Sequence, residues 1–122
     1  MHKDALVYLQ HILAECDFIV SVIQAETTKD DFLADETIKR AVVRSLEIIG
    51  EATKKIPADN KIKWDTISWK NMAGMRDRLI HDYMGVNYSI VWDVVKNIIP
   101  KLRFEIQEIV EKSGFDQKSH SD

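Results

Sequence analysis

The sequence contains a single cysteine, Cys16, among its 122 residues. One cysteine excludes an internal disulfide framework, and no charged-then-apolar leader precedes the first amphipathic segment, so we expect a protein of the reducing cytoplasm. No uninterrupted apolar run approaches the ~18 residues that span a bilayer, which predicts no membrane segment. A chain of this length is expected to form one domain, because it is too short to enclose two cores.

The sequence also lacks the signatures of several enzyme classes. It has no Gly-rich phosphate loop, no dinucleotide fingerprint and no activated serine or cysteine motif. Its four histidines form no ligand-spaced pair, and the carboxylates of Glu47 and Glu51, which share a helical face, have no accompanying histidine. We therefore predict no cofactor and no required metal.

Charge is unevenly distributed along the chain. Residues 1–36 carry a net charge of −6 and residues 104–122 a net charge of −3, whereas residues 37–103 carry a net charge of +6. A basic middle between acidic ends favours a protein that meets phosphate locally and does not coat nucleic acid at large. A mosaic of solvated helix faces would give the same distribution, so charge alone does not decide.

Apolar residues recur at helical spacing in four segments, whose limits are set by capping residues and helix breakers. In the first half we expect a helix after Asp4 to near Glu26, a short corner at Phe32-Leu33, and a helix capped by Asp35 that ends near Ile56. In the second half we expect a loop from Pro57 through Trp64, a helix from Trp69 to about Asp82 capped by Ser68, and a helix from near Tyr88 capped by Asn87, with a kink or a short break at Pro100.

These elements predict an all-α fold, an antiparallel up-and-down bundle of three long helices and one shorter helix. The domain is expected to cover residues 1–112, and the polar residues 113–122 to form a disordered tail. Gly50 lies inside the second long helix, where glycine costs about 1 kcal/mol relative to alanine. The sequence therefore predicts that another helix approaches Gly50 closely, with a tolerated defect as the alternative.

Residues 76–83 are the most informative stretch, because Arg76, His81 and Tyr83 fall within about two turns of one predicted helix. On that helix His81 projects roughly 160° from the centre of the apolar face. The apolar face consists of Trp69, Met72, Met75 and Leu79. A lone histidine on a helix is most often structural or solvent-facing, so its neighbours decide whether it is catalytic.

The neighbours of His81 favour chemistry on a phosphate. Asp77 lies four residues earlier and can accept from one ring nitrogen, which fixes the tautomer. Arg76 can bring a planar donor fork to a phosphate, and Tyr83 can hydrogen-bond a phosphate or stack on a base. The Arg78–Asp82 spacing is better explained by an ordinary exposed ion pair.

Together these groups suit metal-independent cleavage of RNA. A neutral imidazole takes the proton from a ribose 2′-hydroxyl, the oxygen attacks the adjacent phosphorus, and the arginine stabilises the charge that develops on the phosphoryl oxygens. The expected products are a 2′,3′-cyclic phosphate and a free 5′-hydroxyl. One motif supplies one imidazole, so a symmetric dimer that faces two motifs across one cleft would supply both a base and an acid. We expect Met84, Trp92 and Val95 to leave apolar surface for such a dimer.

The spacing Arg76-x4-His81-x-Tyr83 resembles the active-site motif of the HEPN superfamily, in particular that of the HepT-like ribonuclease toxins. Two further stretches carry the resemblance: the Gly-Glu-Ala helix at residues 44–52, and the last helix with Val91-Trp92 and residues 99–102. Together they cover roughly residues 4 to 110.

The resemblance implies a HEPN-type bundle, a homodimer with a composite cleft, and ribonuclease activity carried by Arg76 and His81. Asp77 stands where close relatives often have asparagine, which leaves the local charge balance open. The resemblance also implies a partner, an MNT-type minimal nucleotidyltransferase antitoxin that transfers AMP to the motif tyrosine, here Tyr83. The alternative is a non-catalytic HEPN module that binds nucleotide or RNA, or scaffolds a nucleotidyltransferase.

Overall fold

The structure is a computed structural model that describes residues 2–79 and 85–114, with side chains from residue 5 onward. The described residues contain eight helices and no strand. In chain order these are α1 (His2–Val22), α2 (Lys29–Ala34), α3 (Glu36–Lys55), α4 (Ala58–Lys63), α5 (Trp69–Ala73), α6 (Met75–Leu79), α7 (Tyr88–Asn97) and α8 (Ile99–Ser113). The predicted all-α bundle is confirmed.

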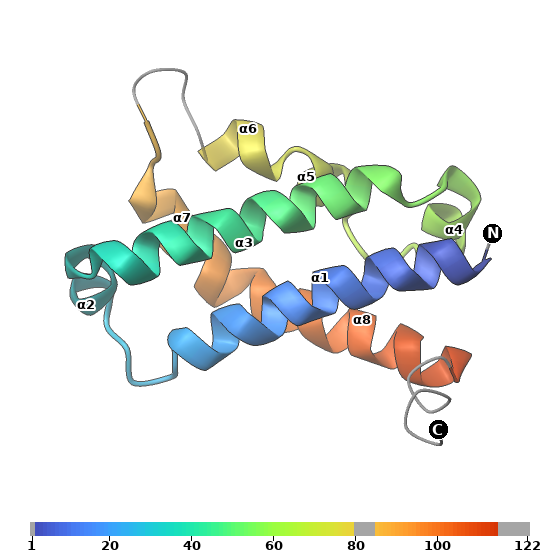
Figure 1. The fold of residues 1–122 in the computed structure, drawn as a ribbon, viewed down its shortest axis with the longest axis horizontal. Coiled ribbons are helices and arrows are strands. Elements are labelled where there is room, and N and C mark those ends of the chain that lie inside the picture. Colours follow the sequence, from blue (N-terminus) through green and yellow to red (C-terminus); the bar gives the residue numbers. More distant parts are fainter. Residues whose placement is uncertain (1, 80–84, 115–122) are drawn as a thin grey trace.

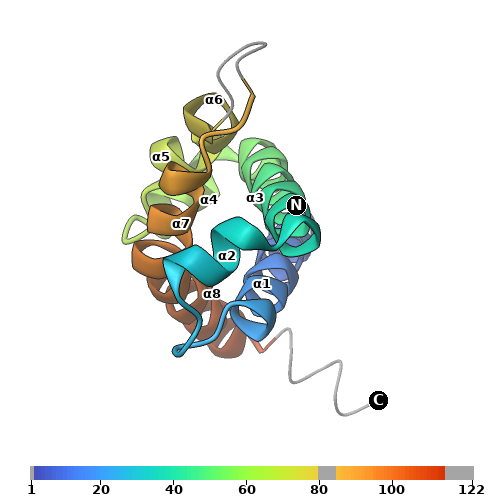
Figure 2. The ribbon, with the colours of Figure 1, turned by 90° about the vertical axis from the view of Figure 1, so that its left-hand side faces the viewer.

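The helices form an antiparallel up-and-down bundle. Helices α1 and α3 run in opposite directions side by side. Helices α7 and α8 follow one another along the length of the bundle, and α8 packs against α1 (Figure 1). Helices α5 and α6 return along α3, and Figure 2 shows α2 crossing one end of the bundle. Helices α5 and α6 are thus both packed against α3, and α6 also contacts α7.

The core lies along the axis of the bundle and is built from the apolar stripes of its long helices. Apart from Leu13, which follows Ile12 directly, the buried positions of α1 are three or four residues apart, which is the spacing that keeps side chains on one helical face. The largest fully buried side chains are Phe32, Leu9, Ile12, Ile19, Leu46, Ile49, Met75, Leu79, Ile99, Ile106, Val42 and Val91. Every helix from α1 to α8 except α4 supplies apolar side chains to this one cluster.

Helix α1 is apolar enough over Ala5–Val22, with a mean hydropathy of 1.5, to match a membrane span in length and composition. It is the one such helix in the part of the chain that the structure describes. The central helix of a bundle needs the same apolar composition, and a third of this window is buried between α3 and α8. Core packing therefore accounts for the apolar residues in the buried part of this window.

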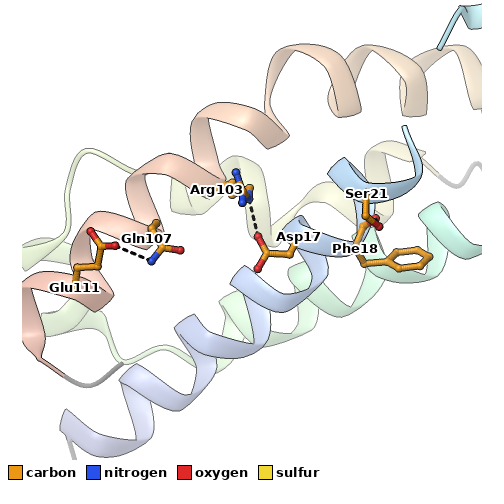
Figure 3. Close-up of polar contacts among 6 residues, drawn as sticks. All are labelled: Asp17, Phe18, Ser21, Arg103, Gln107 and Glu111. Carbon is orange, nitrogen blue, oxygen red and sulfur yellow. Dashed lines mark hydrogen bonds and ion pairs between the residues drawn. The ribbon is translucent and has the colours of Figure 1, made fainter. Parts of the chain in front are cut away.

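A polar contact joins α1 to α8 at the surface. Arg103 Nε donates to Asp17 Oδ1 at 2.6 Å across the two helices (Figure 3). Figure 3 also shows two contacts within single helices, from Ser21 Oγ to the Phe18 carbonyl at 2.6 Å and from Gln107 Nε2 to Glu111 Oε2 at 3.0 Å. Because both partners of the Asp17–Arg103 pair are about half exposed, this contact adds little to the stability of the fold.

The predicted helix caps at Asp35 and Asn87 are confirmed by side-chain hydrogen bonds. Asp35 Oδ1 accepts from the Ile38 amide at 3.0 Å, and Asn87 Oδ1 accepts from the Ile90 amide at 3.2 Å. Ser68 occupies the predicted cap position of α5, but its side chain makes no cap hydrogen bond. The predicted interruption near Pro100 is also confirmed, since α7 ends at Asn97 and α8 begins at Ile99.

Three predicted elements differ from the structure. Helix α1 begins at His2, before Asp4, and ends at Val22, because Thr27 closes a turn on Gln24 through two hydrogen bonds of 3.1 Å. The predicted loop from Pro57 contains α4, since a proline without an N–H is well suited to begin a helix as well as to end one.

The third difference concerns the predicted helix over residues 69–82. It divides at Gly74 into α5 and α6, and the described part of α6 ends at Leu79. The amide of Gly74 still bonds to the Lys70 carbonyl at 3.0 Å, and the amide of Arg78 bonds to the Gly74 carbonyl at 3.1 Å. The break is therefore local, and the two short helices keep one common apolar face.

Candidate functional site

The motif region begins where α5 packs closely on α3. A Cβ atom added to Gly50 would stand 3.4 Å from the carbonyl oxygen of Met72 and 4.0 Å from that of Ala73. The backbone of α5 thus passes over the glycine as predicted, at an ordinary van der Waals distance that still leaves room for a Cβ atom. This contact determines where along α3 the next helix, α6, is placed.

The apolar face predicted for the motif region is confirmed. All four of its side chains are buried, namely Trp69, Met72, Met75 and Leu79. Trp69 also donates from its indole nitrogen to the carbonyl of Trp64 at 2.9 Å, which satisfies the one polar atom of the ring. With this face turned into the core, residues 76–78 must lie on the outside of the bundle.

Arg76 lies on that outer side of α6, with 56% of its side chain exposed. Its Nε atom is 3.5 Å from Oε2 of Glu47 on α3, and the Glu47 side chain is only 22% exposed. The second oxygen of Glu47 faces another arginine, with Oε1 3.8 Å from Nη1 of Arg44. One carboxylate of α3 therefore stands between two guanidinium groups.

Glu47 is a site residue that the sequence analysis missed. The sequence places Glu47 three residues after Arg44 on one helix, and this spacing is enough to predict their ion pair. Its pairing with Arg76 is a contact between two helices far apart in the sequence, which no local spacing indicates. From the sequence, the one prediction made for the Glu47 carboxylate is that it shares a helical face with that of Glu51.

Of the remaining predicted site residues, only Asp77 belongs to the described part of the chain. Asp77 is exposed on α6, next to Arg76. His81 and Tyr83 lie outside the described residues, and so do the predicted contacts of His81 with Asp77 and of Arg78 with Asp82. Both ends of the intervening segment are described and meet, because the Asn87 amide donates to the Leu79 carbonyl at 2.9 Å. The chain thus lies beside the outer end of α6 again at Asn87.

The apolar surface predicted for a dimer is partly used within the chain. Val95 is buried in the core, and Trp92 packs against Phe32 with ring centroids 5.6 Å apart. Lys96 lies over the Trp92 ring, 5.3 Å from its centroid. The reason given for the dimer is therefore wrong for Val95 and holds only in part for Trp92, while Met84 lies outside the described residues.

Among the described residues, neither the groove between α1 and α8 nor any cluster of metal ligands includes the Arg76 region. A groove of about 650 Å³ lies between the start of α1, the loop after α4 and the end of α8, and its lining includes Leu6, Trp64 and Ile109. Within residues 2–79 and 85–114 no three metal-ligating side chains come together. The prediction of metal-free chemistry is left to experiment.

Comparison with known proteins identifies the family. The family described as Ribonuclease HepT-like matches residues 9–109. A candidate RNase of Caldanaerobacter subterraneus subsp. tengcongensis is 47% identical over 105 residues, which cover 86% of this chain and 93% of the relative. A candidate RNase of Methanocaldococcus jannaschii is 43% identical over 118 residues, or 96% of this chain and 97% of the relative.

A further relative, a candidate ribonuclease HepT of Thermococcus cleftensis, is 44% identical over 108 residues, which cover 88% of this chain and 94% of that protein. No solved structure matches the chain significantly. The matched residues contain all of the motif, from Arg76 to Tyr83, and the Gly-Glu-Ala stretch of α3. On the extent of the family match and the identity to these relatives, the chain belongs to the HepT-like ribonuclease family.

Proposed function

We propose that this HepT-like ribonuclease is the toxin of a HEPN/MNT toxin–antitoxin pair, a metal-independent endoribonuclease of the cytoplasm. Its substrate is RNA, and its catalytic residues are Arg76 and His81. The observation that carries the assignment to these residues is the position of Arg76. A half-exposed guanidinium, held by Glu47, stands five residues before His81 in the sequence.

The proposed reaction needs a base, an acid and a cation. His81 removes the proton from a ribose 2′-hydroxyl, and the resulting oxygen attacks the adjacent phosphorus. The P–O bond to the 5′-oxygen of the next nucleotide breaks, and that oxygen takes a proton from an acid. Arg76 donates to the phosphoryl oxygens, where negative charge builds up in the transition state.

Two copies of the chain would complete this set of groups. In a homodimer that places two motifs in one cleft, the imidazole of one protomer acts as base and that of the other as acid. Asp77, exposed beside Arg76, is a supporting residue that would orient the imidazole of His81.

We further propose that an MNT-type nucleotidyltransferase antitoxin silences the toxin by transferring AMP to Tyr83. The adduct would place an anionic phosphate beside Arg76, where the substrate phosphate must bind, so like charges and bulk would both exclude RNA. In this step the Tyr83 hydroxyl releases its proton to solvent, its oxygen attacks the α-phosphorus of ATP, and pyrophosphate leaves.

The catalytic assignment is tested by His81→Ala. The variant protein should lose RNA cleavage and growth inhibition while its circular dichroism stays helical. Wild-type products should carry 2′,3′-cyclic phosphate ends, and cleavage should persist in excess EDTA. Full toxicity of a folded His81→Ala protein would rule out the assignment, and activity that is lost in EDTA and restored by a divalent metal would rule out metal-free chemistry.

The regulatory step has its own test. Co-expression with the cognate nucleotidyltransferase should add AMP units to Tyr83, which intact-mass and peptide mass spectrometry detect, and Tyr83→Phe should block the addition. An unmodified Tyr83 in a fully neutralised complex would mean that the antitoxin acts by occlusion. A wild-type protein that binds RNA but never cuts it would favour the alternative, a non-catalytic HEPN binding module.

A further inference from the structure

Glu47 joins two arginines from two helices on the outer side of the bundle. Its Oε2 atom faces Arg76 of α6 at 3.5 Å, and its Oε1 atom faces Arg44 of α3 at 3.8 Å. Both guanidinium groups are more than half exposed, at 56% for Arg76 and 65% for Arg44, whereas the carboxylate is largely covered. The trio keeps one net positive charge and therefore still attracts phosphate.

The direction of the Arg76 contact determines which part of the guanidinium remains for a ligand. Glu47 engages the Nε side of the group. The opposite edge consists of the two terminal Nη amino groups, which can donate two parallel hydrogen bonds to two phosphoryl oxygens. A long exposed side chain that had no such anchor would spread over many rotamers, and each would present this edge differently.

We propose that Glu47 is a positioning residue for Arg76 and that Arg44 is a second phosphate-binding residue of the same site; this rests on the proposed ribonuclease function. Glu47 holds the Nε side of Arg76 against α3 so that the Nη edge faces the scissile phosphate. Arg44, on the other oxygen of the same carboxylate, lies close enough to contact a neighbouring phosphate of the bound strand. Glu47 itself touches no substrate.

The two roles predict different kinetic effects on a short single-stranded RNA. Glu47→Gln should lower kcat at least tenfold with little change in KM, because the transition-state contact of Arg76 loses its fixed geometry. Arg44→Ala should raise KM with kcat nearly unchanged, because it removes uniform binding. It should also reduce the slope of log(kcat/KM) against log[salt] by about 0.7, the value for one phosphate contact on a single strand.

Glu36 provides a matched control on the same helix. Its carboxylate also stands between two cations, 2.6 Å from Lys39 and 3.7 Å from Arg40. It lies three turns before Glu47, roughly 16 Å along the helix axis. Glu36→Gln makes the same change in net charge and should leave kcat and KM as in the wild type. Equal effects of Glu36→Gln and Glu47→Gln, or a wild-type kcat in Glu47→Gln, would overturn the positioning role.

A measurement without turnover separates this inference from the proposed function. In ¹⁵N-edited NMR spectra the Nε–H signal of Arg76 should shift in Glu47→Gln, while that of Arg103, which is paired with Asp17, stays in place as an internal reference. Inorganic phosphate should move the Arg76 signal at lower concentration in the wild type than in Glu47→Gln. If the wild type cuts no RNA but these differences appear, the ribonuclease proposal fails and the positioning role stands. Identical Arg76 signals in both proteins would overturn the positioning role whatever the activity.

Discussion

At the scale of single residues, Arg76 is the group whose chemistry is most specific. Arg76→Lys keeps the positive charge but replaces the planar fork with a point ammonium, which cannot contact Glu47 and two phosphoryl oxygens at once. We expect kcat to fall by about 10²–10³, equivalent to about 2.7–4 kcal/mol of lost transition-state stabilisation. Single-turnover cleavage of a labelled RNA measures this. Near-normal turnover would mean that the arginine supplies only a general positive potential.

Cys16 illustrates a residue that burial removes from chemistry. Its side chain is fully buried in α1, and desolvation, reinforced by the negative charge of Asp17, raises the pKa of the thiol from 9.0 to about 12. The native protein should therefore react with a thiol reagent such as DTNB only as fast as it opens, and unfolding in denaturant should release the reaction. Rapid labelling of the native protein at pH 8 would contradict the buried position.

The same pKa shift predicts how stability depends on pH. Because the folded state holds the thiol proton more tightly than the unfolded state, this contribution is fully present below pH 9 and is lost as pH rises from 9 towards 12. Cys16→Ala should remove this part of the alkaline destabilisation. Urea unfolding at pH 8 and pH 10.5 compares the two proteins, and an unchanged difference between those pH values in Cys16→Ala would contradict the assignment.

At the scale of secondary structure elements, the contact of α3 with α5 leaves limited space above Gly50. A methyl group there would meet the Met72 carbonyl at 3.4 Å, an ordinary contact distance, and alanine favours a helix by about 1 kcal/mol over glycine. Gly50→Ala should thus be neutral or slightly stabilising. Gly50→Val adds two further carbons against backbone that cannot yield, and should destabilise by about 1–3 kcal/mol. Denaturant midpoints would test the pair, and equal midpoints would show that α5 does not approach closely.

The elements also show how far local sequence determines this structure. The four apolar stripes, the caps at Asp35 and Asn87 and the interruption near Pro100 follow from spacing and side-chain chemistry within a few residues, and the structure confirms them. The division of the motif helix at Gly74 was not predicted, because a lone glycine breaks a helix only where the surrounding contacts favour the break. The pairing of Glu47 with Arg76 was missed for a related reason, since it depends on how α6 is placed across α3.

At the scale of the whole molecule, the proposed homodimer must be reconciled with where apolar surface is exposed. The large exposed hydrophobic side chains among the described residues are Val7 and Phe18 on α1, Ile62 on α4 and Phe104 on α8. None belongs to α6 or α7, so burial of apolar surface alone would place an interface on α1 and α8. The composite-site model instead requires contact near the motif, at α6 and the first turn of α7.

Two substitutions distinguish these surfaces. Ser89 is exposed in the first turn of α7, and Ser89→Arg would place bulk and like charge on both sides of a two-fold axis there. Phe104→Ser removes an apolar side chain that is 63% exposed on α8. We expect multi-angle light scattering at micromolar concentration to give twice the 14.1 kDa chain mass for the wild type and Phe104→Ser. Ser89→Arg should instead give a monomer that has lost RNA cleavage together with the second imidazole.

The result decides between three arrangements of the site. Loss of the dimer in Phe104→Ser with an intact Ser89→Arg dimer would place the interface on α8, away from Arg76, and each protomer would then need its own acid. A wild-type monomer with full activity would remove the composite site altogether. A Ser89→Arg monomer that is folded but inactive would leave the shared cleft as the one arrangement in which a single His81 per chain serves both proton transfers.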